Sequence, residues 1–310
     1  MQLVLVCLIL LDDRPNLLEQ TVARLAAGEF AQAESLARQA LAQAPRDTIT
    51  EADSRNNLAA ALLEQGKLQE AEPHLRRAIE LGTRLYGAEH AHVVRMLSNL
   101  AQLLADSGQL ARAEPILLRT LYLTSRSRPA DRRQLALDNH NLGALHLREG
   151  ELAKARRYLT EALRLATDPE HRLMSWNALT QVSLRQQRWE AAENELQQAH
   201  RAAESLPANH PHRALLELNL ASLRAHQGRL AEARAAGERA VRLQLHWYPA
   251  NHRISLAFID VYRGFLQRSH DRPGVQRVNR WIASIKRRPA GEMQALICAN
   301  GLNCCDYYRR

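Results

Sequence analysis

The sequence has little of what would mark a catalytic or disulfide-bonded protein. It contains four cysteines in 310 residues, and aromatic residues make up 5%. No cysteine lies in the central part of the chain, so the fold does not depend on disulfide bonds. We find no glycine-rich phosphate loop, no His-Glu-x-x-His, no Gly-x-Ser-x-Gly and no paired metal-ligand spacing. We therefore expect a protein that is not an enzyme and that uses no cofactor or metal.

A long hydrophobic run is also missing. Residues 1–11 are apolar apart from Gln2, but this run is too short to span a bilayer as a helix. No basic residue precedes the run and no small-residue cleavage site follows it. Two interpretations stay open for residues 1–14: a signal remnant of an exported or periplasmic protein, or a buried first segment of a cytoplasmic one. We favour the cytoplasmic interpretation and expect no integral membrane span.

The C-terminal tail, residues 289–310, holds three of the cysteines: Cys298, Cys304 and Cys305. Their spacing matches none of the usual zinc patterns, and no histidine lies nearby. We expect a flexible tail after Pro289. The role of its cysteines stays open.

Charge of one sign is not concentrated anywhere. The formal net charge is +9, which raises the possibility of nucleic-acid binding. However, the arginines alternate with Glu and Gln, no block of five like charges occurs, and few aromatics are present for base stacking. We expect solvated helix faces, and a nucleic-acid-binding basic solenoid is the alternative.

Instead of such features, the chain repeats one stretch several times. The clearest copies are residues 56–80, 98–122, 140–164 and 218–242. In each, an apolar helix pattern runs to a turn, and a second helix pattern follows. One residue marks the turn in each unit: Gly28, Gly66, Gly108, Gly150, Gln187 and Gly228. Glycine suits the left-handed end of a helix, and Gln187 breaks that rule.

A small residue stands five positions after each turn, where it allows two helices to approach closely. These residues are Ala33, Ala71, Ala113, Ala155, Ala192 and Ala233. Such a helix pair cannot bury its apolar faces alone, so the next pair must stack on it. Residues 253–288 lack the markers and read as a degenerate capping pair. We predict an all-α, right-handed solenoid over residues 15–288, with six helix pairs plus this cap.

These positions resemble the tetratricopeptide repeat. Four dipeptides fall where that family has Leu-Gly: Leu58-Ala59, Leu100-Ala101, Leu142-Gly143 and Leu220-Ala221. Trp176 falls on the family's Trp position, and the alanines after the turns fall on its most regular Ala. The longer spacing and the loops YGAEH, PANHPH and PANH resemble the kinesin-light-chain type. The resemblance implies a superhelix whose concave groove binds proteins or peptides.

An asparagine row is the most informative polar feature. Asn57, Asn99, Asn141 and Asn219 each stand nine residues before the turn, and Asn177 stands one residue out of that register. Asparagine is a poor residue for a helix interior, so its recurrence indicates a use. Its amide could bond the neighbouring helix and fix the stacking. Alternatively, it could face the groove and bind the backbone of an extended peptide. Both interpretations stay open.

The same register nominates further groove residues. They are Arg95, Gln102, His140, Arg148, Gln181 and Arg185. Since arginine binds carboxylates in a bidentate fork, we expect a preference for an acidic peptide or a free C-terminus. The competing interpretation is that these arginines face solvent without a specific partner.

Histidines are scattered, and several fall in predicted loops. These are His90, His92, His210, His212 and His252. We expect them to cap helices or form local hydrogen bonds rather than to bind metal.

Function is predicted from this architecture as a non-catalytic scaffold or adaptor that binds a partner in its groove. The alternatives are an exported assembly factor and a nucleic-acid-binding protein. The sequence leaves the partner, the pathway and the oligomeric state open.

Overall fold

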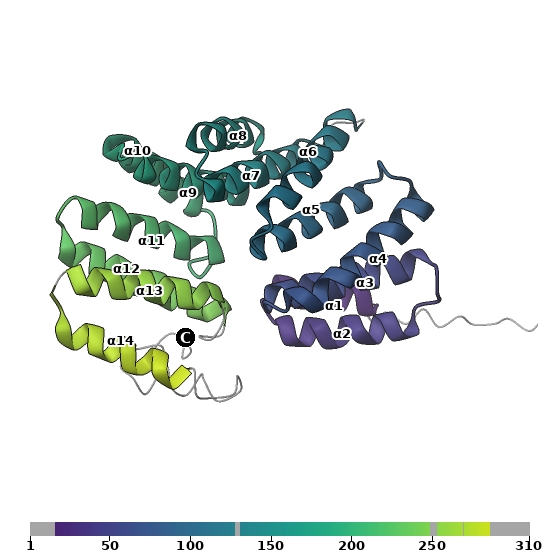
Figure 1. The fold of residues 1–310 in the computed structure, drawn as a ribbon, viewed down its shortest axis with the longest axis horizontal. Coiled ribbons are helices and arrows are strands. Elements are labelled where there is room, and N and C mark those ends of the chain that lie inside the picture. The colour runs from purple at the N-terminus through teal and green to yellow at the C-terminus, as the bar shows by residue number, and fades with distance from the viewer. Residues whose placement is uncertain (1–15, 128–130, 249–252, 269, 286–310) are drawn as a thin grey trace, which may run out of the picture. The chain divides into compact units, whose positions relative to one another are not determined.

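The computed structural model describes residues 16–127, 131–248, 253–268 and 270–285. The predictions for the apolar leader and for the cysteine-containing tail lie outside this range. Within it the chain forms fourteen helices and no strand. It divides into two units, residues 1–85 and residues 86–310, and we describe each separately (Figure 1).

The first unit contains two helix hairpins. Its helices are α1 (Leu17–Ala26), α2 (Phe30–Gln43), α3 (Ile49–Glu64) and α4 (Leu68–Tyr86), the last of which ends one residue beyond the boundary. Helix α2 packs against both α1 and α3, and α1 also contacts α3. The two hairpins therefore stack mainly through α2 and α3, with α1 also touching α3.

The second unit continues with five hairpins in chain order (Figure 1). Four of them follow the repeat pattern: α5 (Ala91–Asp106) with α6 (Leu110–Arg126), α7 (Arg132–Glu149) with α8 (Leu152–Leu165), α9 (Pro169–Arg185) with α10 (Trp189–Ala203), and α11 (Pro211–His226) with α12 (Leu230–Trp247). The predicted cap forms the fifth, α13 (Arg253–Arg268) with α14 (Arg272–Ile285). Each first helix contacts the first helix of the next hairpin. The predicted all-α fold of stacked helix pairs is thus confirmed.

The predicted turn residues adopt the left-handed conformation that closes a hairpin. The five glycines have φ between 74° and 82°. Gln187 adopts the same conformation, with φ 58°, although it carries a side chain. His270 stands at the corresponding turn of the capping hairpin and has φ 56°. The turn geometry is therefore kept even where the sequence departs from glycine.

The six alanines after the turns lie in the packed core. Each is fully buried, with 0% of its surface exposed. Larger residues fill the space between successive hairpins: Leu147, Leu159 and Leu179, from α7, α8 and α9, share one cluster. Aromatic residues of α13, including Phe258 and Tyr262, close the last interface against α11 and α12. Clusters of buried residues thus connect the successive hairpins from α7 to α14.

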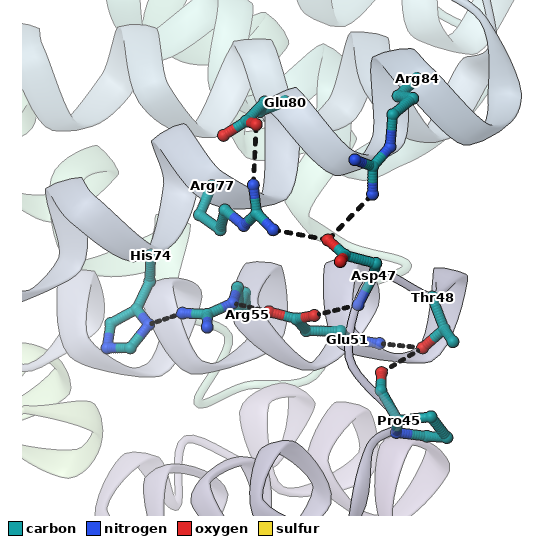
Figure 2. Close-up of polar contacts among 9 residues, drawn as sticks. All are labelled: Pro45, Asp47, Thr48, Glu51, Arg55, His74, Arg77, Glu80 and Arg84. Atoms are coloured by element: carbon teal, nitrogen blue, oxygen red, sulfur yellow. Dashed lines mark hydrogen bonds and ion pairs between the residues drawn. The ribbon is translucent and has the colours of Figure 1, made fainter.

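A polar network ties α3 to α4 in the first unit (Figure 2). Glu51, which is 6% exposed, accepts hydrogen bonds from Arg55 Nε at 2.8 Å and from the backbone N–H of Asp47 at 2.7 Å. Arg55 continues to His74 of α4, and the Asp47 carboxylate accepts from Arg77 at 2.7 Å. Burial raises the pKa of Glu51, but these hydrogen bonds outweigh it and hold the pKa below its usual range. A buried, ionised carboxylate therefore fixes the loop before α3.

The left-handed turn at Gln187 predicts a stability gain on replacement by glycine. A residue with a Cβ in this conformation costs about 1 kcal/mol, so Gln187→Gly should stabilise the protein by up to that amount. The matched control is Gly150→Ala: a Cβ there meets no atom within 4 Å, so its cost is purely conformational and should be about 1 kcal/mol. Thermal unfolding of both variants measures the two effects. Equal midpoints for all three proteins would contradict this account.

The burial and hydrogen bonds of Glu51 predict a larger loss of stability when this residue is replaced. Glu51→Ala leaves the Arg55 guanidinium and the Asp47 N–H without their buried acceptor, so we expect a loss of about 1–3 kcal/mol. Glu80→Ala is the control, because Glu80 is 65% exposed in its ion pair with Arg77 and should change stability by less than about 1 kcal/mol. Denaturant unfolding at pH 7 compares the two. A loss at Glu80 as large as that at Glu51 would contradict the assignment.

Candidate functional site

A cavity opens between the first helices of the second unit. Its volume is about 170 Å³. Helices α5 and α7 form most of its wall, and α6 and α9 contribute one residue each. The lining residues are Ala101, Gln102, Ala105, Asp106, Leu117, His140, Asn141, Ala144, Leu145, Arg148 and Met174.

Four of the residues predicted to line a groove meet in this cavity: Gln102, His140, Asn141 and Arg148. Gln102 comes from α5 and the other three from α7. Helical spacing explains the grouping, since residues three and four apart share one face. These four residues therefore lie together, on α5 and α7.

The remaining predicted residues lie outside the cavity. Arg95 is exposed and Asn99 half-buried on the preceding turns of α5, and Gln181 is half-buried on α9. Asn57 is half-buried on α3, in the first unit.

Two members of the asparagine row are engaged in stacking. Asn177 is fully buried, and its Nδ2 donates to the carbonyl of His212 at 3.0 Å. Asn219, 3% exposed, donates to the carbonyl of Asn177 at 3.0 Å. These bonds join α9 to α11, which supports the structural interpretation at both positions. Asn141 is half-buried and lines the cavity instead.

The two predicted groove arginines on α7 and α9 have partners within the protein. Arg148 donates to the Asp106 carboxylate of α5 at 2.8 Å. Arg185 donates to the carbonyl of Leu147 on α7 at 2.5 Å. Each arginine thus reaches back to the preceding hairpin. Half of the Arg148 side chain stays exposed, at 49%. Arg95 has no ion pair within the residues the structure describes.

Histidines from three hairpins gather beside the cavity. His140 Nδ1 lies 3.2 Å from Ser175 Oγ of α9. His171 Nδ1 lies 2.7 Å from the carboxylate of Asp168. Two further rings, His210 and His212 at the start of α11, lie 5.3 Å apart. Their Nε2 atoms lie 3.7 Å and 3.8 Å from Glu170.

Burial keeps part of this cluster uncharged. It lowers the pKa of His140 to about 4, with a smaller contribution from the nearby His171. It lowers the pKa of His212 to about 3, and repulsion from His210, His140 and His171 adds to the effect. The pKa of His210 is lowered by burial as well, against the opposing attraction of Glu170. Neutral imidazoles at these positions can both donate and accept hydrogen bonds at pH 7.

The prediction that loop histidines cap helices is confirmed at two positions. His90 accepts from the backbone N–H of His92 at the start of α5, and His210 accepts from that of His212 at the start of α11. His252 lies outside the described residues. The proximity of His140, His171 and His212 was not predicted from the sequence, although the repeat register relates two of them. His171 and His212 each stand sixteen residues before their turn residue, which places them at equivalent positions of adjacent repeats.

One group could offer three ligands to a metal ion. A ligand atom from each of His146, Glu149 and Glu151 lies within 4.8 Å of the others. However, His146 Nδ1 is hydrogen-bonded to Glu149 at 3.0 Å, and Lys154 pairs with Glu151 at 2.5 Å. These side chains are therefore already held by a hydrogen bond and an ion pair within the protein. None of the helices among the described residues is long and apolar enough to cross a membrane.

Comparison with known families agrees with this geometry. Tetratricopeptide repeat models match residues 50–124, 92–168 and 178–244, which together are more than half of the chain. The chain belongs to the tetratricopeptide repeat family. No curated protein sequence matches it significantly. The kinesin-light-chain subclass stays a prediction.

Several solved structures share the fold of this tetratricopeptide repeat protein. A Rap protein complexed with competence and sporulation factor has a TM-score of 0.70 and 14% identity, covering 87% of this chain and 74% of that one. BtubC (BKLC) from P. vanneervenii has a TM-score of 0.56 and 19% identity, covering 72% and 93%. The APC/C hetero-tetramer Cut9–Hcn1 has a TM-score of 0.57 and 15% identity, covering 84% and 48%. At these identities the likeness establishes the fold alone.

The histidine cluster predicts a loss of stability in mild acid. A histidine free in the unfolded chain titrates near pH 6.5, whereas His140 and His212 stay neutral in the fold until about pH 4 and 3. Below pH 6.5 the unfolded state therefore binds more protons, so stability falls as the pH is lowered toward these values. We expect a lower thermal midpoint at pH 5 than at pH 7, by roughly 2–4 °C for each kcal/mol lost.

Variants isolate this effect from other titrations. Substituting His140→Gln with His212→Gln should flatten the dependence between pH 7 and pH 5. His200→Gln is the control, because His200 is exposed on α10. If the double variant loses as much stability as the wild type over this interval, the two histidines do not carry the dependence.

Proposed function

We propose that this chain is a non-catalytic scaffold that holds an extended peptide segment of a partner protein against α5, α7 and α9. The observation that supports the proposal most is the cavity, because four residues nominated for a groove by the repeat register line it together. Two of the structures that share the fold, the Rap complex and Cut9–Hcn1, hold a second molecule. The fold is therefore compatible with such a role.

The floor of the cavity suits an apolar side chain. Small residues open the space, notably Ala101, Ala105 and Ala144, and Leu145 and Met174 add apolar walls. An apolar cavity of about 150 Å³ is large enough to bind benzene, so a volume of about 170 Å³ admits a Leu or Phe side chain. We infer that one apolar residue of the peptide anchors here.

The rim of the cavity suits a peptide backbone. Gln102 and Asn141 stand on facing helices and both line the cavity. An amide donates and accepts hydrogen bonds, so it can pair with any peptide unit. Such pairing favours an extended segment whose sequence is read only at the anchoring side chain.

The predicted acidic preference now rests mainly on Arg95. The charge of Arg148 is balanced by Asp106, and Arg185 already donates to a backbone carbonyl. Arg95 stands seven residues before Gln102, two helical turns along the same face of α5. We propose that it attracts an acidic side chain or a free C-terminus that extends beyond the anchor.

A cavity-filling variant tests the proposal. Peptides selected on the full chain from a random display library are synthesised, and their affinity is measured by fluorescence anisotropy. Ala144→Phe should fill the cavity and weaken binding at least tenfold, which is about 1.4 kcal/mol. The control Ala153→Phe adds the same ring at an exposed position on α8 and should leave affinity unchanged. Selected peptides that bind the Ala144→Phe protein as tightly as the wild type would refute the proposal.

A second arm tests the charge preference separately. Arg95→Glu should weaken peptides that carry an acidic residue or a free C-terminus about two- to fivefold, the range expected for an exposed ion pair. Amidation of the C-terminus, or replacement of the acidic residue by its amide, should remove the difference. If Arg95→Glu has no effect on any selected peptide, the groove binds without an acidic preference.

A further inference from the structure

Helix α6 exposes an apolar stripe that the hairpin packing does not use. Leu118 is 42% exposed and Tyr122 is 55% exposed, on adjacent turns. Ala111 and Pro115 are also exposed and continue the line toward the start of the helix. We call these four residues the α6 stripe. Their spacing of four, three and four is that of the a and d positions of a coiled coil. The helix packs on its neighbours through other residues, including the buried Ala113, Leu117 and Thr120.

The second helices of the other three hairpins that follow the repeat pattern carry polar or small residues at the positions of Pro115, Leu118 and Tyr122. The equivalents are Arg157, Thr160 and Arg164 on α8, Asn194, Gln197 and Arg201 on α10, and Ala235, Glu238 and Arg242 on α12. Since α8, α10 and α12 pack as hairpins without a large apolar residue there, the fold does not require one on α6. Water-exposed apolar surface on one helix out of four indicates a use outside the fold.

Arginines line one edge of the stripe. Arg112, Arg119 and Arg126 follow one another at intervals of seven residues, and all are exposed. With the stripe at a and d, the arginines fall at the e position, which in coiled coils pairs with charges on the facing helix. Arg126 donates to the hydroxyl of Tyr122 at 3.2 Å, and its guanidinium lies 5.6 Å from that ring. This places a positive charge directly beside the most exposed ring of the stripe.

We propose that this face of α6 binds an amphipathic helix of a partner protein, whose apolar seam covers the α6 stripe and whose flanking acidic residues face Arg112, Arg119 and Arg126. The charge of the helix selects this occupant. Helix α6 carries a single acidic residue, Glu114, so its edge is complementary to an acidic helix. A second copy of the chain is less suited, because each copy has a formal net charge of +9 and like charges oppose association. The surface is separate from the cavity and does not depend on the peptide site.

Two designed peptides test the proposal on the full chain. Both are three-heptad helices with Leu at a and d; one has Glu at e and g, and the other has Lys there. We expect the Glu peptide to bind and the Lys peptide to bind at least tenfold more weakly. Leu118→Gln with Tyr122→Arg, which gives α6 the residues of α10, should weaken the Glu peptide at least tenfold. Arg119→Glu with Arg126→Glu should exchange the preference for the Lys peptide.

The control is Gln197→Ala with Arg201→Ala, which alters the same two positions on α10 and should leave binding unchanged. Unaltered thermal midpoints confirm that the variants fold. Equal binding of both peptides by the wild type, binding by neither, or undiminished binding by the Leu118→Gln/Tyr122→Arg protein would each overturn the proposal. So would concentration-dependent self-association in sedimentation that this variant abolishes, because the stripe would then be covered by a second copy. If the Ala144→Phe protein no longer binds the peptides selected for the cavity, this test is unaffected, because the α6 stripe is a separate surface.

Discussion

The close approach of two helices at a fully buried alanine is the contact on which each hairpin of the repeat depends. The alanine follows the left-handed turn at a fixed distance, and at all six positions no part of it is exposed. A larger side chain at this position would push the two helices apart and open a void between successive hairpins. Because protein interiors are close-packed, even a void the size of a methylene group lowers stability. Because the same closure recurs, each helix presents its side chains in the same orientation as its counterpart. The recurring helix contact therefore produces a surface on which equivalent side-chain positions recur from one hairpin to the next.

That regularity explains why much of the structure could be predicted from the sequence. Helical periodicity, the turn residue and the small residue after it are local features, and each was confirmed in place. The register also relates Gln102 and Asn141, which stand six and nine residues before their turn glycines and line one cavity from α5 and α7. Even the departure at Gln187 kept the left-handed turn, since the packing on both sides of it determines the backbone more strongly than the residue's own preference.

The choice of side-chain partners could not be predicted in the same way. Arg148 and Arg185 stand at equivalent positions, yet one pairs with a carboxylate and the other with a backbone carbonyl. The difference lies in the preceding repeat, which has Asp106 at the equivalent position for the first and Arg148 for the second. Hydrogen bonds of this kind differ by only about 1 kcal/mol from their competitors, so a pattern of residue types does not decide among them. The histidine cluster was not predicted for a related reason: its members come from three repeats, and His140 stands at a different position of its repeat from His171 and His212.

Comparison of a repeat with its neighbours distinguishes two kinds of departure. Gln187 departs from glycine at a cost in backbone energy, but the surrounding hairpins hold the turn, so the fold itself compensates the change. Asn177 departs by one residue from its row, and the bonds that link it to α11 account for its position. Leu118 and Tyr122 have no such compensation within α6, because their equivalents on three other helices do without apolar side chains. A departure that the fold neither needs nor offsets is best explained by contact with another molecule, and in this chain the strongest such departure lies on a second helix rather than beside the cavity.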